Sequence, residues 1–129
     1  MLIELVRAIP GDPWLAEVRT PLGPAVLRWG GEQAAEPGDH HVEWTVDEDV
    51  VWGQNTRPAA ASWPALRSEG DHLVLRGRLT CTEDGAALLD LGDTSVLLGL
   101  ADPLPEGSAG AWVELRTGRD QVVLHPYRL

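Results

Sequence analysis

Lysine and phenylalanine are absent from this 129-residue chain, and cysteine occurs only once, at Cys81. Without lysine the chain cannot form the phosphate-binding loop of many nucleotide-binding proteins or the Schiff base of pyridoxal enzymes. A single cysteine excludes an intramolecular disulfide framework and a zinc site made of cysteines. No apolar run approaches the ~20 residues that a membrane-spanning helix needs. Several classes of function are therefore excluded before any motif is considered.

Basic residues are also scarce, since 20 Asp and Glu stand against 10 Arg and give a net charge of −10. Such a chain repels phosphate polymers and attracts basic surfaces. The amino terminus lacks the basic start and long apolar stretch of a secretory signal, and one cysteine suits a reducing compartment. We therefore expect a cytoplasmic protein, and the amino-acid usage is typical of a high-GC bacterial genome.

Glycine and proline interrupt the chain at short intervals, with 14 Gly and 10 Pro, and polar and apolar residues alternate between the interruptions. The clearest case is residues 73–81, where Leu73, Leu75, Leu79 and Cys81 share one face and polar residues share the other. This alternation is the pattern of a half-buried β-strand, and it places Cys81 toward the core. We predict an all-β protein made of short strands.

The order of predicted strands and turns recurs after about 70 residues, as in a duplicated chain. The aligned pairs include Leu2 with Leu73, Arg7 with Arg78, and Val42 with Val113. Any two alternating segments align in a similar way, so the duplication is a hypothesis. The division predicts a first β unit at residues 1–53, an Ala/Pro/Ser connector at 54–70, and a second, OB-like unit at 71–129.

Each predicted unit has several short strands, with a long loop before its last hairpin, a rhythm typical of oligonucleotide/oligosaccharide-binding (OB-type) barrels. We therefore predict short-stranded small barrels, arranged as two tandem OB-like halves. The alternative is one pseudo-twofold β-barrel or sandwich, which would bury more core per residue. Two hairpins are predicted, one joining residues 41–46 to 50–53 and one joining 111–116 to 121–125.

Six tryptophans supply nearly all the aromatic residues. In a chain without Phe they are expected to fill core positions, although indole rings on a β surface also bind partners. The candidate partner-binding residues are the acidic tip of the first hairpin with its flanking indoles and one connector residue: Asp47, Glu48, Asp49, Trp44, Trp52 and Trp63. Acidic groups would steer a basic protein surface toward the indoles, unless the tip is simply a solvated turn.

A possible basic stripe lies in the second half, where Arg76 and Arg78 share a strand face and Arg116 and Arg119 follow. A stripe of this kind can follow a nucleic-acid backbone. Because both halves are negatively charged, we expect these arginines to pair with nearby carboxylates instead.

Catalytic and metal-binding signatures are weak. Asp39, His41 and Glu43 share one face of a predicted strand and are suitable ligands for zinc or manganese, but their spacing matches no known signature. No nucleophile elbow or metalloprotease motif occurs. We therefore predict no catalytic residue, no metal and no cofactor.

These observations predict a non-catalytic cytoplasmic binding protein, acting as an adaptor, an assembly subunit, or an inhibitor of the immunity type. The expected partner is another protein with a basic surface, whereas a membrane is excluded and nucleic acid is not favoured. Two alternatives stay open: an OB-like barrel that binds nucleic acid or carbohydrate, and a small metal-dependent β-barrel enzyme that uses the face of Asp39, His41 and Glu43.

Overall fold

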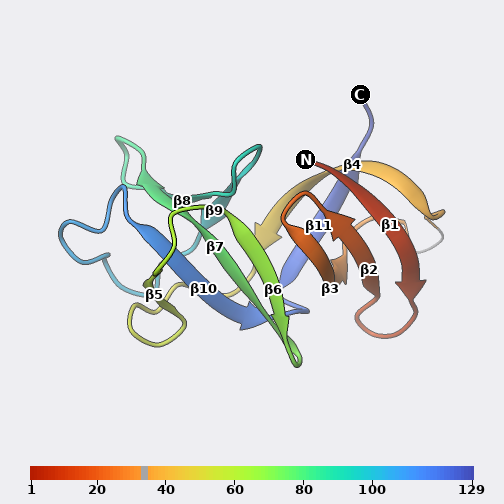
Figure 1. Ribbon diagram of the computed structural model, residues 1–129, viewed down its shortest axis with the longest axis horizontal. Coiled ribbons are helices and arrows are strands. Elements are labelled where there is room, and N and C mark those ends of the chain that lie inside the picture. The colour runs from red at the N-terminus through yellow and green to blue at the C-terminus, as the bar shows by residue number, and fades with distance from the viewer. Residues whose placement is uncertain (33–34) are drawn as a thin grey trace.

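The computed structural model describes residues 1–32 and 35–129, and within them the chain forms strands but no α-helix (Figure 1). No described segment is a helix long and apolar enough to cross a membrane. The strands are β1 (Leu2–Ile9), β2 (Leu15–Thr20), β3 (Gly23–Trp29), β4 (Gly38–Val46), β5 (Thr56–Pro58), β6 (Ala65–Glu69), β7 (His72–Cys81), β8 (Ala87–Asp90), β9 (Ser95–Leu98), β10 (Trp112–Gly118) and β11 (Val122–Tyr127). The all-β prediction is confirmed.

Five strands close into a small barrel in the order β1-β2-β3-β11-β4, seen on the right of Figure 1. All neighbours are antiparallel except β3 and β11, which run parallel. The pairing of β1 with β2 is irregular between Leu5 and Arg7. A bulge of this kind bends a strand and lets it turn around a barrel. The prediction of a small barrel is therefore confirmed for this part of the chain.

The other strands form a second sheet in the order β5-β10-β7-β8-β9, with β6 also paired to β7. One edge of β7 pairs with β6 along residues 72–76 and with β8 along residues 78–81. Gly77 lies where the partner changes, and a Cβ there would stand 2.5 Å from the carbonyl oxygen of Asp90. Only glycine allows the backbone of β8 to approach this closely.

The strand order of the barrel recurs in the second sheet, as β4-β1-β2-β3 and β10-β7-β8-β9. The pairing of β2 with β3 has the same register as that of β8 with β9. The buried pair Ala16 and Leu27 corresponds to the buried pair Ala87 and Leu98, 71 positions later. The two halves of the chain therefore share one four-strand arrangement.

The first strands do not keep the predicted offset. Leu2 was aligned with Leu73, but Leu2 is 46% exposed and Leu73 is buried, so this match is wrong. Alternation alone cannot detect such a displacement, because a shift of one residue in a strand exchanges the two faces while leaving the pattern intact.

The fifth strand of each arrangement comes from the other half of the chain. β5 follows β4 in sequence but pairs with β10, and β11 follows β10 but pairs with β4. Both predicted hairpins, residues 41–46 with 50–53 and 111–116 with 121–125, are therefore wrong. A strand has only two hydrogen-bonding edges, and those of β10 are taken by β7 and β5, just as those of β4 are taken by β1 and β11.

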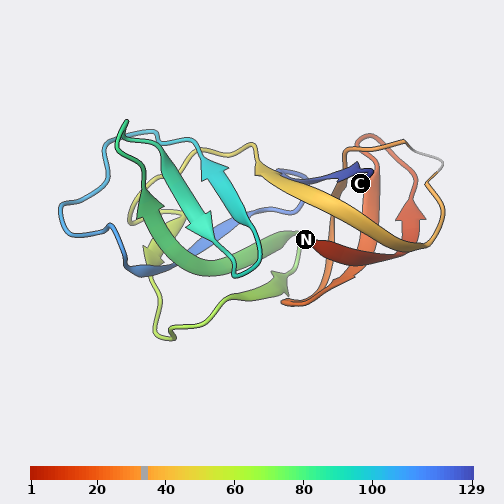
Figure 2. The same ribbon diagram turned by 90° about the horizontal axis from the view of Figure 1, so that it is seen from above.

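This exchange also crosses the predicted unit boundaries. β11 belongs by sequence to the unit at 71–129 but completes the barrel made by residues 2–46. The connector predicted at 54–70 contains β5 and β6, which both join the second sheet. Viewed from above, β4 runs out of the barrel toward that sheet (Figure 2).

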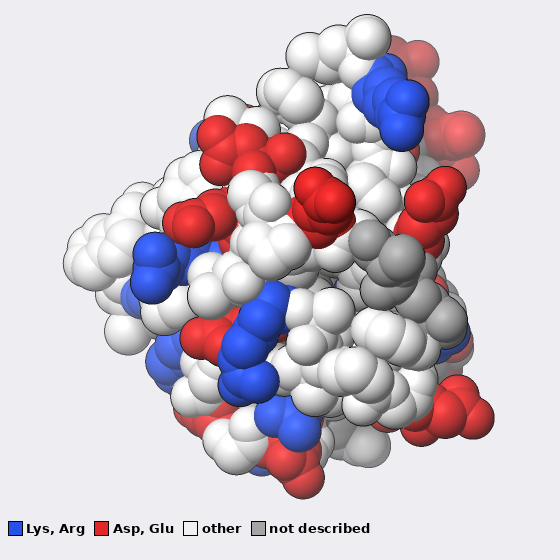
Figure 3. All heavy atoms as spheres, turned by 90° about the vertical axis from the view of Figure 1, so that its right-hand side faces the viewer, with Lys and Arg blue, Asp and Glu red and all other residues white. Residues whose placement is uncertain are grey.

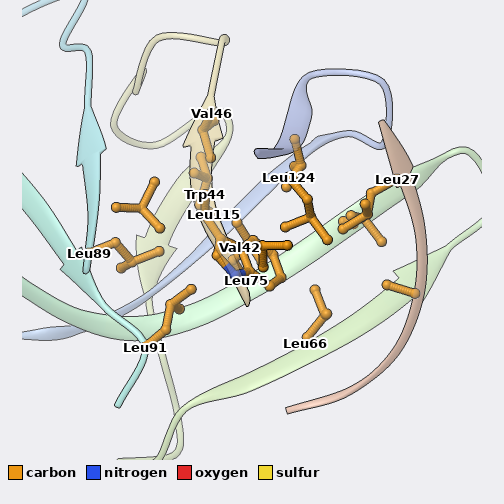
Figure 4. Packing of buried hydrophobic residues seen from close by; sticks show 14 of the residues in the cluster. Leu27, Val42, Trp44, Val46, Leu66, Leu75, Leu89, Leu91, Leu115 and Leu124 are labelled. Atoms are coloured by element: carbon orange, nitrogen blue, oxygen red, sulfur yellow. The ribbon is translucent and has the colours of Figure 1, made fainter. Parts of the chain in front are cut away.

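One hydrophobic core serves both sheets. Side chains from both sheets point into a single region in Figure 4 and belong to one buried cluster. Members from the barrel include Leu27, Val42 and Leu124, and members from the second sheet include Leu75, Leu89 and Leu115. Cys81, predicted to face the core, is exposed at the end of β7, although Ala87 opposite it on β8 is buried, so this prediction is wrong.

Replacing Leu124 by Ala should test the closure of the barrel by β11. Leu124 is fully buried, so the change should lower the free energy of unfolding by about 2–5 kcal/mol. The matched change Leu97→Ala removes the same atoms from a side chain that is 62% exposed, and it should alter stability by less than about 0.5 kcal/mol. Equal effects of the two changes in chemical denaturation would contradict this role of β11.

Candidate functional site

The acidic residues Asp47, Glu48 and Asp49 lie in the crossover segment, residues 47–55, which connects the barrel to the second sheet. They were predicted to form the tip of a hairpin, and this is wrong because both edges of β4 are already paired. Asp47 lines a hollow of about 510 Å³ on the barrel. Glu48 and Asp49 line a different hollow of about 470 Å³. Asp47 therefore faces a different hollow from Glu48 and Asp49.

Asn55 holds the crossover segment in place. Its Oδ1 accepts a 2.8 Å hydrogen bond from the backbone N–H of Val51. Its Nδ2 donates to the carbonyl oxygen of Asp49 at 2.8 Å and to Glu48 Oε2 at 3.2 Å. The backbone carbonyl of Asn55 accepts a further bond from the N–H of Arg116 at 2.7 Å. This one side chain thus fixes the path of the chain from one sheet to the other.

The three candidate tryptophans lie in three different environments. Trp44 is 4% exposed and belongs to the core, so its predicted role as a surface anchor is wrong. Trp52 is half-buried and packs against the core. Trp63 is 62% exposed. Of the three predicted indoles, Trp63 therefore offers a partner the largest part of its surface.

Asp39, His41 and Glu43 do not form a metal cluster together. Asp39 and Glu43 are exposed, and the ring of His41 lies 6.0 Å from the ring of Tyr127. Across residues 1–32 and 35–129, no three His, Cys, Asp or Glu side chains come together in a way that would hold a metal ion.

The outer face of the second sheet gathers arginine and tryptophan side chains. We name it the Arg/Trp face. Its members are Arg57 of β5, Trp112, Glu114 and Arg116 of β10, Val74, Arg76 and Arg78 of β7, Arg67 and Glu69 of β6, and Trp63 of the preceding loop. Alternation along each strand directs these strand side chains outward, because their neighbours Thr56, Val113, Leu115, Leu73, Leu75 and Leu66 are buried.

Two carboxylates link the arginines of this face into one network. Glu114 Oε1 lies 3.5 Å from Arg57 Nη2, and Glu114 Oε2 lies 3.1 Å from Arg67 Nη1. Glu69 joins the network, since its carboxylate accepts from Arg67 at 3.1 Å and from Arg116 Nε at 3.1 Å. The predicted pairing of arginines with carboxylates is therefore confirmed for Arg116, for Arg76, which lies 4.0 Å from Glu114, and for Arg119, which lies 3.8 Å from Asp71. Arg57 and Arg67 are additional members of the network, whereas Arg78 donates to the carbonyl oxygen of Gly110.

The network keeps its carboxylates ionised. Burial alone would raise the pKa of Glu114, but the hydrogen bond and charge of Arg67, with contributions from Arg57 and Arg76, hold that pKa below its ordinary value. The pKa of Glu69 is lowered by its hydrogen bonds with Arg116 and Arg67. The pKa of Arg67 is raised by Glu114.

Trp63 stacks on an arginine of this face. The guanidinium carbon of Arg76 lies 5.3 Å from the centre of the Trp63 ring, within the range of a cation–π contact. The Arg76 side chain is only 16% exposed, and its Nε lies 4.0 Å from Glu114 Oε2. That buried Nε has no hydrogen-bond partner among the described residues. Arg76 thus orients an exposed indole and keeps one N–H unsatisfied.

A small pocket of about 190 Å³ opens within the Arg/Trp face. Val74 lines it and is only 3% exposed although it points outward. Val74 lies opposite Arg116 on β10 and Arg67 on β6, which line the same pocket. Arg57 and the polar residues Gln54 and Asn55 complete the wall together with Glu69 and Glu114.

The charge of the Arg/Trp face opposes that of the molecule. Five of the ten arginines lie on it, against the carboxylates of Glu69 and Glu114 and that of Asp90 on β8, which lies opposite Arg78. The face therefore has an excess of two positive charges in a chain of net charge −10. On the barrel end, acidic and basic side chains are interspersed (Figure 3).

Comparison with protein-family models, with curated proteins and with solved structures gave no match.

Sequence reasoning identified Arg76, Arg78 and Arg116 as members of a stripe but missed Arg57 and Arg67. Both lie in the segment predicted to be a connector, where Ala, Pro and Ser obscure the short strands β5 and β6. The sequence signal there was weak, because Ser68 follows Leu66 on the same face and breaks the alternation of apolar and polar residues.

Replacing Glu114 by Gln should destabilise the protein in a pH-dependent manner. Because the pKa of Glu114 is lowered on folding, its charge contributes stability above the ordinary value near 4.5, and this contribution is lost as the pH falls through the lowered value. We expect a deficit of about 1–3 kcal/mol in the free energy of unfolding at neutral pH. The deficit should shrink below a pH of about 4.

The matched control is Glu17→Gln, since Glu17 pairs at 2.6 Å with Arg7 but both side chains are exposed. Its effect should stay within about 0.5 kcal/mol at every pH. A deficit of Glu114→Gln that persists unchanged into acid would show that the charge of Glu114 is not what stabilises the fold.

Proposed function

We propose that this chain is a non-catalytic binding protein, of the adaptor, assembly-subunit or inhibitor type, whose Arg/Trp face holds a short acidic segment of a partner protein. The observation that carries the proposal is Trp63, an exposed indole held against Arg76 on an arginine-rich sheet face. Tryptophan and arginine are the residues most enriched at the energetic centres of protein interfaces. The face combines an apolar anchor with charged groups that fix the orientation of a partner.

Charge supports a short acidic occupant over a nucleic acid. Arginine and indole side chains on a β surface also suit single-stranded nucleic acid, which is the second candidate. However, the excess of positive charge is confined to one face, and a phosphate polymer that extends beyond it meets the acidic remainder of the chain. Repulsion over distances beyond the Debye length of ~8 Å is screened at physiological salt, so a short segment avoids most of it.

The expectation of a basic partner applies to the acidic part of the surface, including Asp47 and Asp49, which are exposed. It is a competing proposal, because it needs a partner of opposite charge at a different place.

The single exposed cysteine, Cys81, supports the proposal that the protein works in a reducing, cytoplasmic environment.

Binding of three probes should separate these proposals. The probes are a short Asp/Glu-rich peptide carrying one leucine, a single-stranded oligothymidine of similar charge, and an Arg-rich peptide. We expect the acidic peptide to bind most tightly, as measured by calorimetry at low and physiological salt. Trp63→Ala should weaken this binding by about tenfold, because it removes the apolar anchor.

The matched control is Tyr127→Ala, which removes an aromatic side chain that is 41% exposed on the barrel. It should leave the affinity for the acidic peptide unchanged, and circular dichroism should show that both variants fold. Tighter binding of oligothymidine would favour the nucleic-acid candidate. Tighter binding of the Arg-rich peptide, lost on replacing Asp47, Glu48 and Asp49 by Ser, would favour the basic partner.

A further inference from the structure

The pocket of about 190 Å³ within the Arg/Trp face is large enough for a single side-chain-sized group. At about 30 Å³ for each water molecule, its volume equals that of about six waters. Three guanidinium groups line it, from Arg57, Arg67 and Arg116. A small, negatively charged ligand therefore suits this lining.

Donors for such a ligand remain available in the pocket. Each guanidinium has five N–H groups in a planar fork. Arg116 donates through Nε to Glu69, and Arg57 donates through Nη2 to Glu114. Most N–H groups of Arg57 and Arg116 are thus not used in the hydrogen bonds within the network, and they flank the opening from two different strands.

The charge balance of the arginine network around the pocket suits a doubly charged anion. Arg57, Arg67 and Arg116 line the pocket together with Glu69 and Glu114. Arg76 lies outside the lining but 4.0 Å from Glu114 Oε2, so the network as a whole has an excess of two positive charges. A phosphate monoester carries a charge of about −1.5 to −2 at neutral pH and has three acceptor oxygens. A single carboxylate would neutralise only half of the excess.

We infer that this pocket binds the phosphate group of a phosphorylated serine or threonine in the acidic partner segment. The inference rests on the proposed function, because it names the partner side chain that would contribute most to binding at the Arg/Trp face. Planar guanidinium groups bind phosphate oxygens in pairs, which gives both affinity and orientation.

The unsatisfied Nε of Arg76 favours the replacement of Glu114 by phosphate oxygens as the acceptor for Arg67. Glu114 Oε2 lies 4.0 Å from that Nε while it contacts Arg67 at 3.1 Å. If phosphate oxygens accept from Arg57 and Arg67, Glu114 is free to move toward Arg76 and accept its buried N–H. Because Arg76 contacts Trp63, this movement couples the phosphate pocket to the apolar anchor.

The test compares three forms of one Asp/Glu-rich peptide, which carry serine, phosphoserine or glutamate at the same position. The phosphoserine form should bind the full-length protein at least about tenfold more tightly than the serine form, which corresponds to 1.4 kcal/mol. Inorganic phosphate at millimolar concentration should compete with it. Arg116→Gln should abolish most of the difference between the two forms.

The control Arg19→Gln removes the same charge from an exposed arginine on the barrel, which pairs with Glu4 at 3.4 Å. It should leave the preference for phosphoserine intact. If Arg19→Gln reduces the preference as much as Arg116→Gln does, the effect is long-range charge and the pocket assignment is wrong.

Lowering the pH gives an independent readout. The second ionisation of a phosphate monoester has a pKa near 6, so the preference for phosphoserine should fall as the pH drops below about 6. Glu69 and Glu114 stay ionised there because their pKa values are lowered. Any effect of His72, which lies opposite Glu69 on β7, would act on the glutamate peptide equally. A parallel loss of binding by both peptides would therefore contradict recognition of a dianion.

The outcomes also separate this inference from the proposed function. Equal binding of the serine and phosphoserine peptides, both weakened by Trp63→Ala, would overturn the phosphate pocket and leave the acidic-segment proposal standing. Absence of binding by all three peptides would overturn both.

Discussion

A β-strand has two hydrogen-bonding edges. In this protein each half of the chain gives one strand to the other half, and these two strands pair with the free edges of β4 and β10. β11 completes the barrel begun by β1 to β4, and β5 pairs with β10 in the second sheet. Each sheet therefore depends on a strand from the other half of the chain. The buried cluster is continuous for the same reason, since Leu124 of β11 packs with barrel residues while its own half supplies Leu115. Neither sequence half contains all the strands of one sheet.

The exchange also builds the surface on which the proposed function depends. The crossover segment carries the chain from β4 to β5 and is held by Asn55, which bonds to Glu48, Val51 and Arg116 through its side chain and backbone. This path places Arg57 directly opposite Glu114 on β10. Without the crossover, Glu114 would have arginine neighbours on β7 and β6 alone. The contact that completes the second sheet is thus also the contact that closes one wall of the arginine pocket.

Alternation in the sequence predicted most of the strands and the faces of most of their side chains, but not which strands pair with one another. The burial of Leu73, Leu75 and Leu79 and the outward position of Arg76 follow from a period of two. The same period fits any partner strand, so it could not show that β11 leaves β10 for β4. Alternation also puts Trp44 on one face with the apolar residues Val42 and Val46, but the hairpin tip expected after it favoured a role at the surface. The short strands β5 and β6 carry Arg57 and Arg67 within a segment rich in Pro, Ala and Ser, where local propensity is weak.

Two kinds of electrostatic interaction affect an anion at the Arg/Trp face: short contacts with the arginines and repulsion by acidic residues outside the face. The balance between them determines which anions bind. Contacts of 3.1 to 4.0 Å between arginines and carboxylates act locally and hold the guanidinium groups in place. The acidic residues outside the face, which bring the net charge to −10, repel those parts of an anion that lie within a Debye length of them. A long polyanion experiences this repulsion along its entire length, whereas a short segment with one dense charge gains the local contacts and little of the repulsion. Under the proposed function, the acidic remainder of the chain therefore disfavours long polyanions. Specificity arises as much from this repulsion as from the arginines themselves.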